Sequence, residues 1–114
     1  MAHECSTDPI IATLREVVAI ESVNADLPGG SDGERGMVDY LTDFFADAGV
    51  PCQTHEALPG RPNVVATLPG RDPTRAVLFD CHMDTATAEG MTIEPFEPVV
   101  KDGKLYGRGS ADTK

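Results

Sequence analysis

Basic residues are few in this sequence. Nine lysines and arginines stand against nineteen aspartates and glutamates in 114 residues, which gives a formal net charge of −10. Nucleic acids and anionic membrane surfaces are bound through basic patches, so this balance argues against both as partners. A charge this negative otherwise indicates a soluble protein.

Long hydrophobic runs are also missing. No apolar stretch approaches the roughly 18 residues of a membrane-spanning helix. The first residues, MAHECSTDP, contain neither the basic region nor the apolar region of a secretory signal. We therefore expect a cytoplasmic protein with no membrane partner. The apolar fraction of 40% is enough for a core, and the length suits one domain.

Cysteine is scarce and irregularly spaced. Cys5, Cys52 and Cys81 form no CxxC motif, so three reduced thiols are the ordinary interpretation in a chain without a visible export signal. Cys81 lies beside His82, which raises the possibility of a Cys–His nucleophile pair. Neighbours along a strand point to opposite faces, however, so the two side chains are poorly placed to pair.

Two amphipathic helices are indicated in the first half of the chain. The first begins at Asp8, a good N-cap, and Pro9, a good first helical residue. The second begins near Ser31 or Asp32, after a loop, and Gly49 is a plausible stop. The apolar stripes that we expect to face the core are Ile10, Ile11, Leu14, Val17 and Val18 in the first helix, and Met37, Val38, Leu41, Phe44, Phe45 and Ala48 in the second.

About five strands are expected after these helices. Val50–Leu58 has a weak strand pattern and Asn63–Leu68 a better one. Ala76–Cys81 has the strongest pattern, and it is apolar on both faces, which is typical of a central strand. An Asp-Gly pair between Glu97–Lys101 and Lys104–Tyr106 indicates a hairpin. These elements predict an α/β or α+β fold in residues 1–114, with no second domain.

The apolar run at Ala76 ends on His82 and Asp84. Residues two apart on a strand face the same way. A metal-binding imidazole usually donates its other ring N–H to a carboxylate or carbonyl, which fixes its tautomer and direction. The HxD pair is therefore either a metal ligand with its supporting acid, or a loop histidine beside a solvated aspartate.

The last eight residues, GRGSADTK, contain two glycines that permit tight turns and close approach of the backbone to other groups. Neither the full GxGxxG nor the P-loop spacing is present, so phosphate binding is poorly supported. Asp112 is either a metal ligand or a surface carboxylate at the exit of the hairpin. Ser110 lacks the GxSxG context of a nucleophilic serine.

Taken in order, RPNVVATLPG, HMDT, EPFEP and DGKLYGRGSADTK resemble the M20 family of zinc aminoacylases and exopeptidases. This group includes acetylornithine deacetylases, succinyl-diaminopimelate desuccinylases, aminoacylases and carboxypeptidases of the G2 type. The resemblance runs from Asn63 to Lys114, and GRGxxDxK is its most specific part. The sequence departs from the family pattern at Cys81, Ala86-Thr87 and Met91, none of which is a ligand position.

The resemblance implies a role for three residues. His82 would be a ligand of one zinc, and Asp84 would be the catalytic-site acid that supports the His82 ring. Asp112 would be the carboxylate that bridges two metal ions, followed by a cis peptide bond to Thr113. The implied cofactors are two zinc ions, with cobalt or manganese as other options. The implied fold is the N-terminal part of a zinc-exopeptidase-like α/β/α sandwich with a mixed, mainly parallel central sheet.

The ligand count indicates an incomplete site. Two zinc ions that share one carboxylate need roughly five protein ligands, and only His82 and Asp112 occupy recognisable positions. The weaker candidates are His3 near the terminus, His55 in a weak strand, and the loop residues Glu89 and Glu94. We therefore expect residues 1–114 to be an incomplete N-terminal portion of a catalytic domain, inactive by itself. The general base, the remaining ligands and a domain that could form a homodimer would lie beyond residue 114.

The reaction that the resemblance implies is metal-assisted hydrolysis of the amide bond in an N-acyl amino acid or small peptide. A different class of function stays open, namely a metal-free binding or interaction module that keeps this half of the fold. A third interpretation is an unrelated hydrolase that uses Ser110 or Cys81 as its nucleophile.

Overall fold

The computed structural model describes residues 7–30 and 32–114. Within them it has two helices, α1 (Thr7–Ala19) and α2 (Arg35–Asp47), and four strands. The strands are β1 (Cys52–Leu58), β2 (Arg61–Ala66), β3 (Val99–Lys101) and β4 (Lys104–Tyr106). The predictions made for Cys5, His3 and Ser31 fall outside the described residues. Neither helix in the described part is long and apolar enough to cross a lipid bilayer.

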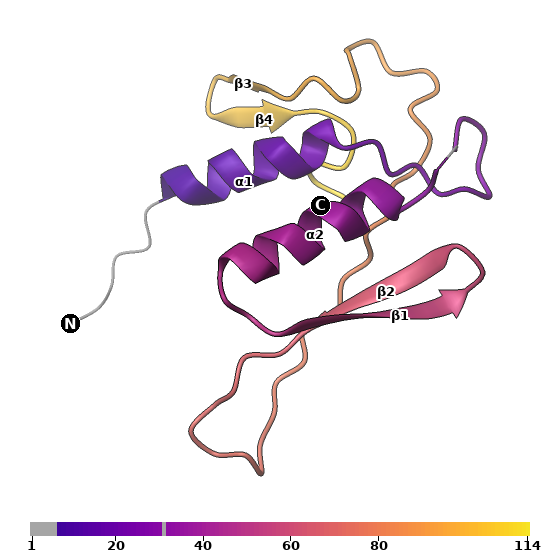
Figure 1. Cartoon of the computed structure of the whole chain (residues 1–114). Coiled ribbons are helices and arrows are strands. Elements are labelled where there is room, and N and C mark those ends of the chain that lie inside the picture. The colour runs from indigo at the N-terminus through magenta and orange to yellow at the C-terminus, as the bar shows by residue number, and fades with distance from the viewer. Residues whose placement is uncertain (1–6, 31) are drawn as a thin grey trace.

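The two helices lie side by side, with one hairpin next to each (Figure 1). The hairpin β1–β2 packs against α2, and the smaller hairpin β3–β4 lies beside α1. Tyr40 on α2 ties the helices together, because its hydroxyl donates a hydrogen bond of 2.7 Å to the Glu16 carboxylate on α1. This arrangement leaves the outer edges of both hairpins without a neighbouring strand among the described residues.

Both helices were predicted from the sequence, with shifted starts. Helix α1 begins at Thr7, so Asp8 lies in its first turn and is not its N-cap; a carboxylate there still interacts favourably with the helix dipole. Helix α2 begins at Arg35, later than predicted, and Glu34 precedes it without a side-chain capping bond. The predicted stop at Gly49 is confirmed, because this residue has the left-handed φ of 67° that ends many helices.

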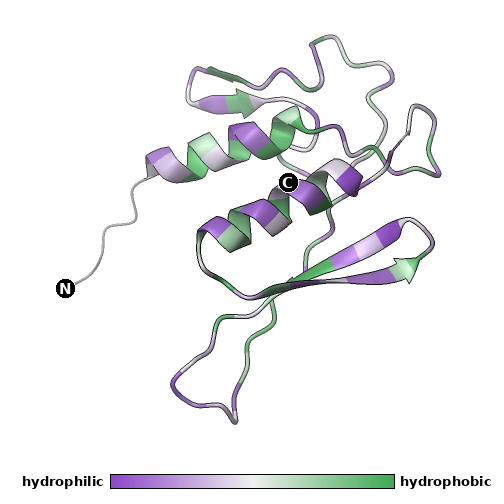
Figure 2. Cartoon of the chain, viewed as in Figure 1, coloured by the Kyte–Doolittle hydropathy of each residue, from purple (hydrophilic) through white to green (hydrophobic). Residues whose placement is uncertain are grey.

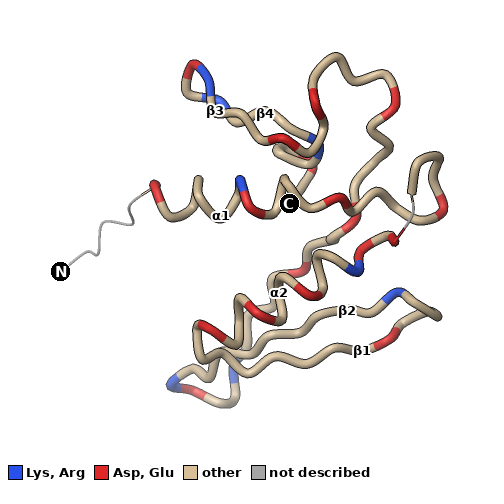
Figure 3. Tube along the Cα trace, turned by 45° about the horizontal axis from the view of Figure 1, so that its top comes forward, with Lys and Arg blue, Asp and Glu red and all other residues tan. Residues whose placement is uncertain are grey.

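The core is small and lies where the C-terminal half of α1 meets the N-terminal half of α2. Only the inner parts of the two predicted stripes are buried, while Ile10 and Ile11 at one end and Phe44 at the other remain exposed. The buried hydrophobic residues are Val17, Val18, Val23, Met37 and Val38. Acidic residues lie in α1, α2, β1 and several loops, and the few basic residues are divided among several segments (Figure 3).

The prediction of a central strand at Ala76–Cys81 is wrong. The segment belongs to no strand and makes no ladder with any described residue. Its apolar side chains are exposed, Val77 at 80%, Leu78 at 85% and Phe79 at 89%, and this hydrophobic stretch follows the loop after the hairpin β1–β2 (Figure 2). A strand needs a partner whose backbone satisfies its N–H and C=O groups, and no described segment supplies one here.

The parallel sheet is therefore absent from the described residues, since both of their sheets are two-stranded antiparallel hairpins. The prediction of mixed helices and strands is confirmed, but the mainly parallel central sheet is not formed by these residues. Among them the parallel pairing is confined to one isolated bridge, between Val23 and Thr85. That bridge positions the candidate site.

Candidate metal centre

The segment that follows the exposed apolar stretch is held by the loop after α1. The Thr85 N–H donates to the Ser22 carbonyl at 2.8 Å, and the Asn24 N–H donates to the Thr85 carbonyl at 3.0 Å. The Ser22 hydroxyl adds a bond of 2.8 Å to the Met83 carbonyl. Ser22, Val23 and Thr85 are almost completely buried. This loop therefore anchors the segment that carries His82 and Asp84.

The His82 ring faces the residue two positions later. Its Nδ1 lies 2.9 Å from the Asp84 carbonyl oxygen and 3.1 Å from Asp84 Oδ1. Both neighbours are acceptors, so Nδ1 must carry the proton in these contacts. The lone pair of a neutral His82 is then on Nε2, which is the atom available to a metal ion.

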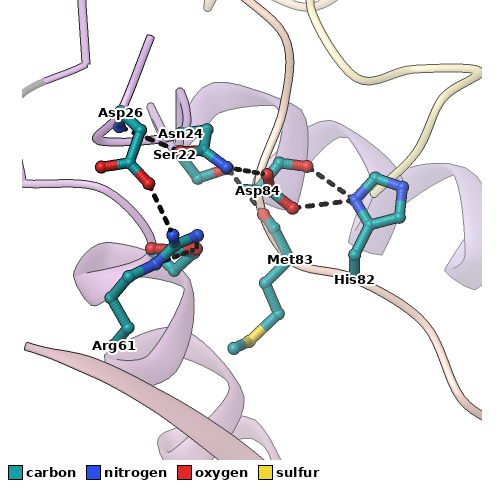
Figure 4. Close-up of polar contacts among 8 residues, drawn as sticks. Ser22, Asn24, Asp26, Arg61, His82, Met83 and Asp84 are labelled. Carbon is teal, nitrogen blue, oxygen red and sulfur yellow. Dashed lines mark hydrogen bonds and ion pairs between the residues drawn. The ribbon is translucent and has the colours of Figure 1, made fainter. Parts of the chain in front are cut away.

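Asp84 is held from its other side by Asn24. The Asn24 Nδ2 donates to Asp84 Oδ2 at 2.7 Å, while Oδ1 faces His82 (Figure 4). Partial burial would raise the pKa of the Asp84 carboxyl. The hydrogen bond from Asn24 and the charge of His82 outweigh burial and hold this pKa below its ordinary value. Asp84 is therefore an ionised acceptor near neutral pH.

Asp112 approaches the other nitrogen of the same ring. The turn after β4 places Asp112 Oδ1 3.5 Å from His82 Nε2, and the Asp112 side chain is 95% exposed. The hydrogen bond to the Asp84 carbonyl is the main reason why the pKa of His82 lies above its ordinary value, and the carboxylates of Asp84 and Asp112 raise it further. The structure thus brings together all three predicted site residues.

Two glycines make this approach possible. A Cβ on Gly107 would overlap Val18 Cγ1, and one on Gly109 would come within 2.6 Å of Lys114 Cγ. Such positions are closer than any ordinary van der Waals contact. Lys114 closes the turn, because its ammonium donates to the Ile20 carbonyl at the end of α1. Burial lowers the pKa of this lysine to about 8, although the charge of Glu21 opposes the shift. The close backbone approach predicted for GRGSADTK is confirmed.

The predicted cis bond after Asp112 is wrong, because none of the described peptide bonds is cis. A cis bond at a non-proline residue costs about 3 kcal/mol and persists only where surrounding structure enforces it. With Asp112 almost fully exposed, nothing in the described part of the chain supplies that constraint.

The separation of the two candidate ligands fits one zinc ion. Donors bound at about 2.1 Å to a tetrahedral zinc lie about 3.4 Å apart, close to the 3.5 Å between His82 Nε2 and Asp112 Oδ1. A neutral ring with its proton on Nδ1 presents a lone pair to a carboxylate oxygen there, which is unfavourable. A proton on Nε2 or a metal ion between the two atoms would make the contact favourable. Among the described residues, no group of three or more His, Cys, Asp or Glu side chains is placed to hold a metal ion.

The weaker ligand candidates are not brought to this pair. His55 lies in β1, where it is exposed and paired in register with Asn63. Glu89 and Glu94 are exposed in the loop before β3. Cys81 is an exposed free thiol, and Ser110 is used in a turn through its N–H bond of 3.3 Å to the Gly107 carbonyl. These positions give a Cys81 or Ser110 nucleophile no support.

A second polar cluster, next to Asn24, was not predicted from the sequence. Arg61 in β2 pairs with Asp26 at 3.2 Å and, more closely, with Glu34 (Figure 4). The hydrogen bond to Glu34 is the main reason why the pKa of Arg61 is raised. Glu34 is mostly buried, and its Oε2 has no partner among the described residues. The cluster fastens the hairpin β1–β2 to the loop that carries Asn24.

Comparison with known proteins finds relatives that cover most of this chain. Residues 78–114, which include all three site residues, match the model of peptidase family M20/M25/M40. The chain is 32% identical over 114 residues to a succinyl-diaminopimelate desuccinylase of Ralstonia nicotianae, covering 93% of this chain and 28% of that protein. It is 31% identical to aminoacylase-1 of Sus scrofa over 110 residues, covering 93% of this chain and 26% of that protein.

An acetylornithine deacetylase of Vibrio vulnificus is 28% identical over 102 residues, which are 88% of this chain and 26% of that protein. The chain therefore spans about a quarter of the length of the curated relatives that it matches. The matched segment contains the HxD pair, Asp112 and the two glycines that let Asp112 approach His82. The chain belongs to the M20/M25/M40 peptidase family, as a partial homologue of its desuccinylases, aminoacylases and deacetylases.

Proposed function

We propose that this chain is the N-terminal, metal-binding portion of the catalytic domain of a di-zinc hydrolase that cleaves the amide bond of N-acyl amino acids or small peptides. The observation that carries the proposal is the approach of His82 Nε2 to Asp112 Oδ1 at the spacing of two ligands on one ion. The names of the relatives, a desuccinylase, an aminoacylase and a deacetylase, support the acyl-amide substrate class.

Each site residue has a defined task in this proposal. His82 would bind one metal through Nε2, while Asp84 accepts the Nδ1 proton and keeps the lone pair on Nε2. Asp112, with its exposed carboxylate, would bridge to the second metal. Bound divalent metals would supply an acidified water as nucleophile and a Lewis acid for the amide carbonyl. The remaining work of this chain is to hold the ligands in place.

The proposal requires further ligands from other polypeptide. Roughly five protein ligands are needed for two zinc ions that share a carboxylate, and the described residues supply two that face each other. The exposed stretch Val77–Phe79 also lacks neighbours in the described part of the chain. We propose that it becomes a central strand of a mainly parallel sheet in an α/β/α sandwich once such polypeptide is present, which would bury its side chains on both faces.

The test is zinc binding by the chain, measured by calorimetry and by mass spectrometry under native conditions. We expect weak binding of one ion, lost in His82→Ala and in Asp112→Asn, and unchanged in His55→Ala, which removes an exposed histidine of β1. Binding that survives both site variants would refute the assignment. In parallel, N-acetyl and N-succinyl amino acids with added zinc should show little or no hydrolysis by the 114-residue chain.

The exposure of Val77–Phe79 favours a second candidate, a metal-free interaction module that offers this stretch to a partner. Zinc binding that depends on His82 would argue against it. Binding of a partner polypeptide with no metal requirement, lost on replacement of Phe79 but not of His82, would favour it.

A further inference from the structure

The loop after α1 contains a residue that acts on the site without being a candidate ligand. Asn24 lies 60 positions from Asp84 in the sequence, yet its Nδ2 donates a 2.7 Å hydrogen bond to Asp84 Oδ2. This bond occupies one carboxylate oxygen and leaves Oδ1 facing His82 Nδ1 at 3.1 Å. We propose that Asn24 is a positioning residue, which fixes the Asp84 carboxylate so that Asp84 in turn fixes the orientation and tautomer of the His82 ring.

Asn24 is itself held on three sides. Its backbone N–H donates to the Thr85 carbonyl at 3.0 Å, and its backbone carbonyl accepts from the Leu27 N–H at 2.9 Å. Its side-chain oxygen accepts from the Asp26 N–H at 2.9 Å. Because the side-chain amide is planar, fixing its oxygen by this bond also fixes the direction of its NH₂ group. The Asn24 donor therefore points at Asp84 from a rigid base.

The Asp84 carboxylate loses a rotational freedom through this bond. A carboxylate next to a ring can rotate about its terminal torsion, which has a broad energy minimum. The bond from Asn24 to Oδ2 restricts this rotation and assigns one oxygen to each partner (Figure 4). Since the residue that accepts the second N–H of a ligating histidine sets the ring's direction, a fixed Asp84 gives a fixed His82.

The parallel bridge between Val23 and Thr85 provides the frame for this contact. The bridge brings the two segments together through backbone bonds that do not depend on the Asn24 side chain. Ser22 strengthens the same frame through its hydroxyl bond of 2.8 Å to the Met83 carbonyl, whereas the Asp84 carboxylate is bonded by Asn24. Different residues therefore make the two kinds of contact: Ser22 supports the backbone frame, and Asn24 contacts the Asp84 carboxylate.

The inference deepens the proposed function and rests on His82 and Asp84 having the roles given there. Two variants test it. Asn24→Asp keeps an acceptor for the Asp26 N–H but replaces the donor to Asp84 with a repelling carboxylate oxygen. Asn24→Ala removes the donor without adding a charge, and it serves if the aspartate variant fails to fold. Ser22→Ala is the matched control, because it weakens the frame and leaves the Asn24 donor in place.

The readout that needs no metal is the His82 tautomer, measured from the ring nitrogen chemical shifts in a long-range ¹H–¹⁵N correlation spectrum at a fixed pH where the ring is neutral. His82→Gln identifies its signals among those of the three histidines. We expect the Nδ1–H tautomer to dominate in the unaltered chain and in Ser22→Ala. Its share should fall in both Asn24 variants. A purely structural role for Asn24 predicts the same tautomer in all folded variants.

The second readout is zinc affinity, by calorimetry with zinc chloride. We expect the Asn24 variants to bind about tenfold more weakly, the low end for residues that support a ligand, and Ser22→Ala to bind as the unaltered chain does. Folded Asn24 variants with an unchanged tautomer and unchanged affinity would overturn the inference. If the unaltered chain binds no zinc but the tautomer still depends on Asn24, the positioning role stands and the di-zinc proposal fails.

Discussion

His82 Nε2 and Asp112 Oδ1 lie 3.5 Å apart, and both residues belong to the segment that matches the peptidase family. The contact depends on two separate supports. The loop after α1 fixes the histidine side through the Val23–Thr85 bridge, and the turn after β4 brings the aspartate through close packing of its two glycines. Disrupting the bridge itself or the turn should therefore affect the pair without touching a ligand, whereas the Ser22 hydroxyl only adds to the backbone bonds of the bridge.

Gly109→Ala tests the turn. A Cβ there would lie 2.6 Å from Lys114 Cγ and 2.9 Å from Thr85 Cγ2, and the residue has a left-handed φ of 84°. Overpacking and backbone strain should together cost about 1–3 kcal/mol in the free energy of unfolding and move Asp112 away from His82. The measurements are urea unfolding and zinc affinity.

The matched control is Gly70→Ala, because a Cβ on Gly70 would meet no atom within 4 Å and this residue has no left-handed φ. Equal stability and equal zinc affinity for the two alanine variants would contradict the role given to the turn.

Arg61→Met tests the ion-pair cluster behind the loop. The variant leaves the mostly buried Glu34 carboxylate without its cation, which is unfavourable because a buried charge then lacks compensation. We expect a clearly lower midpoint of thermal unfolding. Adding Glu34→Gln should recover part of the loss, since it removes the stranded charge. A double variant no more stable than Arg61→Met would show that the arginine acts by packing alone.

Stability should depend on pH in the alkaline range in two opposing ways. Burial lowers the pKa of Lys114 to about 8, below the value of about 10.4 in an unfolded chain. The unfolded state therefore binds more protons between these values, so stability rises with pH there. The pKa of Tyr40 is raised to about 12 by burial and by its bond to Glu16, so above about pH 10 the folded state binds more protons and stability falls.

Chemical unfolding across pH 7–11 measures both effects. Lys114→Met should lose the rise that begins near pH 8, and Tyr40→Phe should lose the fall at higher pH. A Lys114→Met profile that still rises in this range would assign the effect to other groups.

Phe79→Ser tests the exposed apolar stretch. Because Phe79 is 89% exposed, its replacement should change the free energy of unfolding by no more than about 0.5 kcal/mol. Self-association should decrease, since an exposed apolar segment with an unpaired backbone is a template for pairing between chains. Sedimentation velocity over a range of concentrations gives the result. Val18→Ala is the opposite control, because Val18 is fully buried. Its truncation should lower the free energy of unfolding and leave self-association through the exposed stretch unchanged.

The helices and the hairpin at the Asp-Gly pair could be predicted because their signals are local, whereas the roles of the three site residues come from the family resemblance and stay a prediction. Apolar spacing, turn residues and the HxD and GRGxxDxK motifs each lie within one short segment. The prediction of a strand at Ala76–Cys81 is wrong because its signal depends on residues that are not local. Its pattern describes a strand that is buried on both faces, and burial requires neighbours that its own sequence cannot specify.

The roles of Asn24 and Arg61 could not be predicted because their partners lie far along the chain. Asn24 has the sequence context of an ordinary loop residue, and nothing near it indicates a bond to Asp84. Arg61 resembles an isolated charge at the start of a strand, whereas in the structure it joins two residues of an earlier segment. Such contacts follow from the register of the Val23–Thr85 bridge and from the packing of β2 on α2.

The Val23–Thr85 bridge has a consequence for assembly of the whole site. This bridge and its hydrogen bonds already order His82 and Asp84. The conformational entropy of these two side chains is therefore lost when this chain folds, before any further ligand arrives. Polypeptide that supplied further ligands would then meet a preorganised histidine. Its binding energy would then have to order only its own ligands, which would favour assembly of the proposed metal centre.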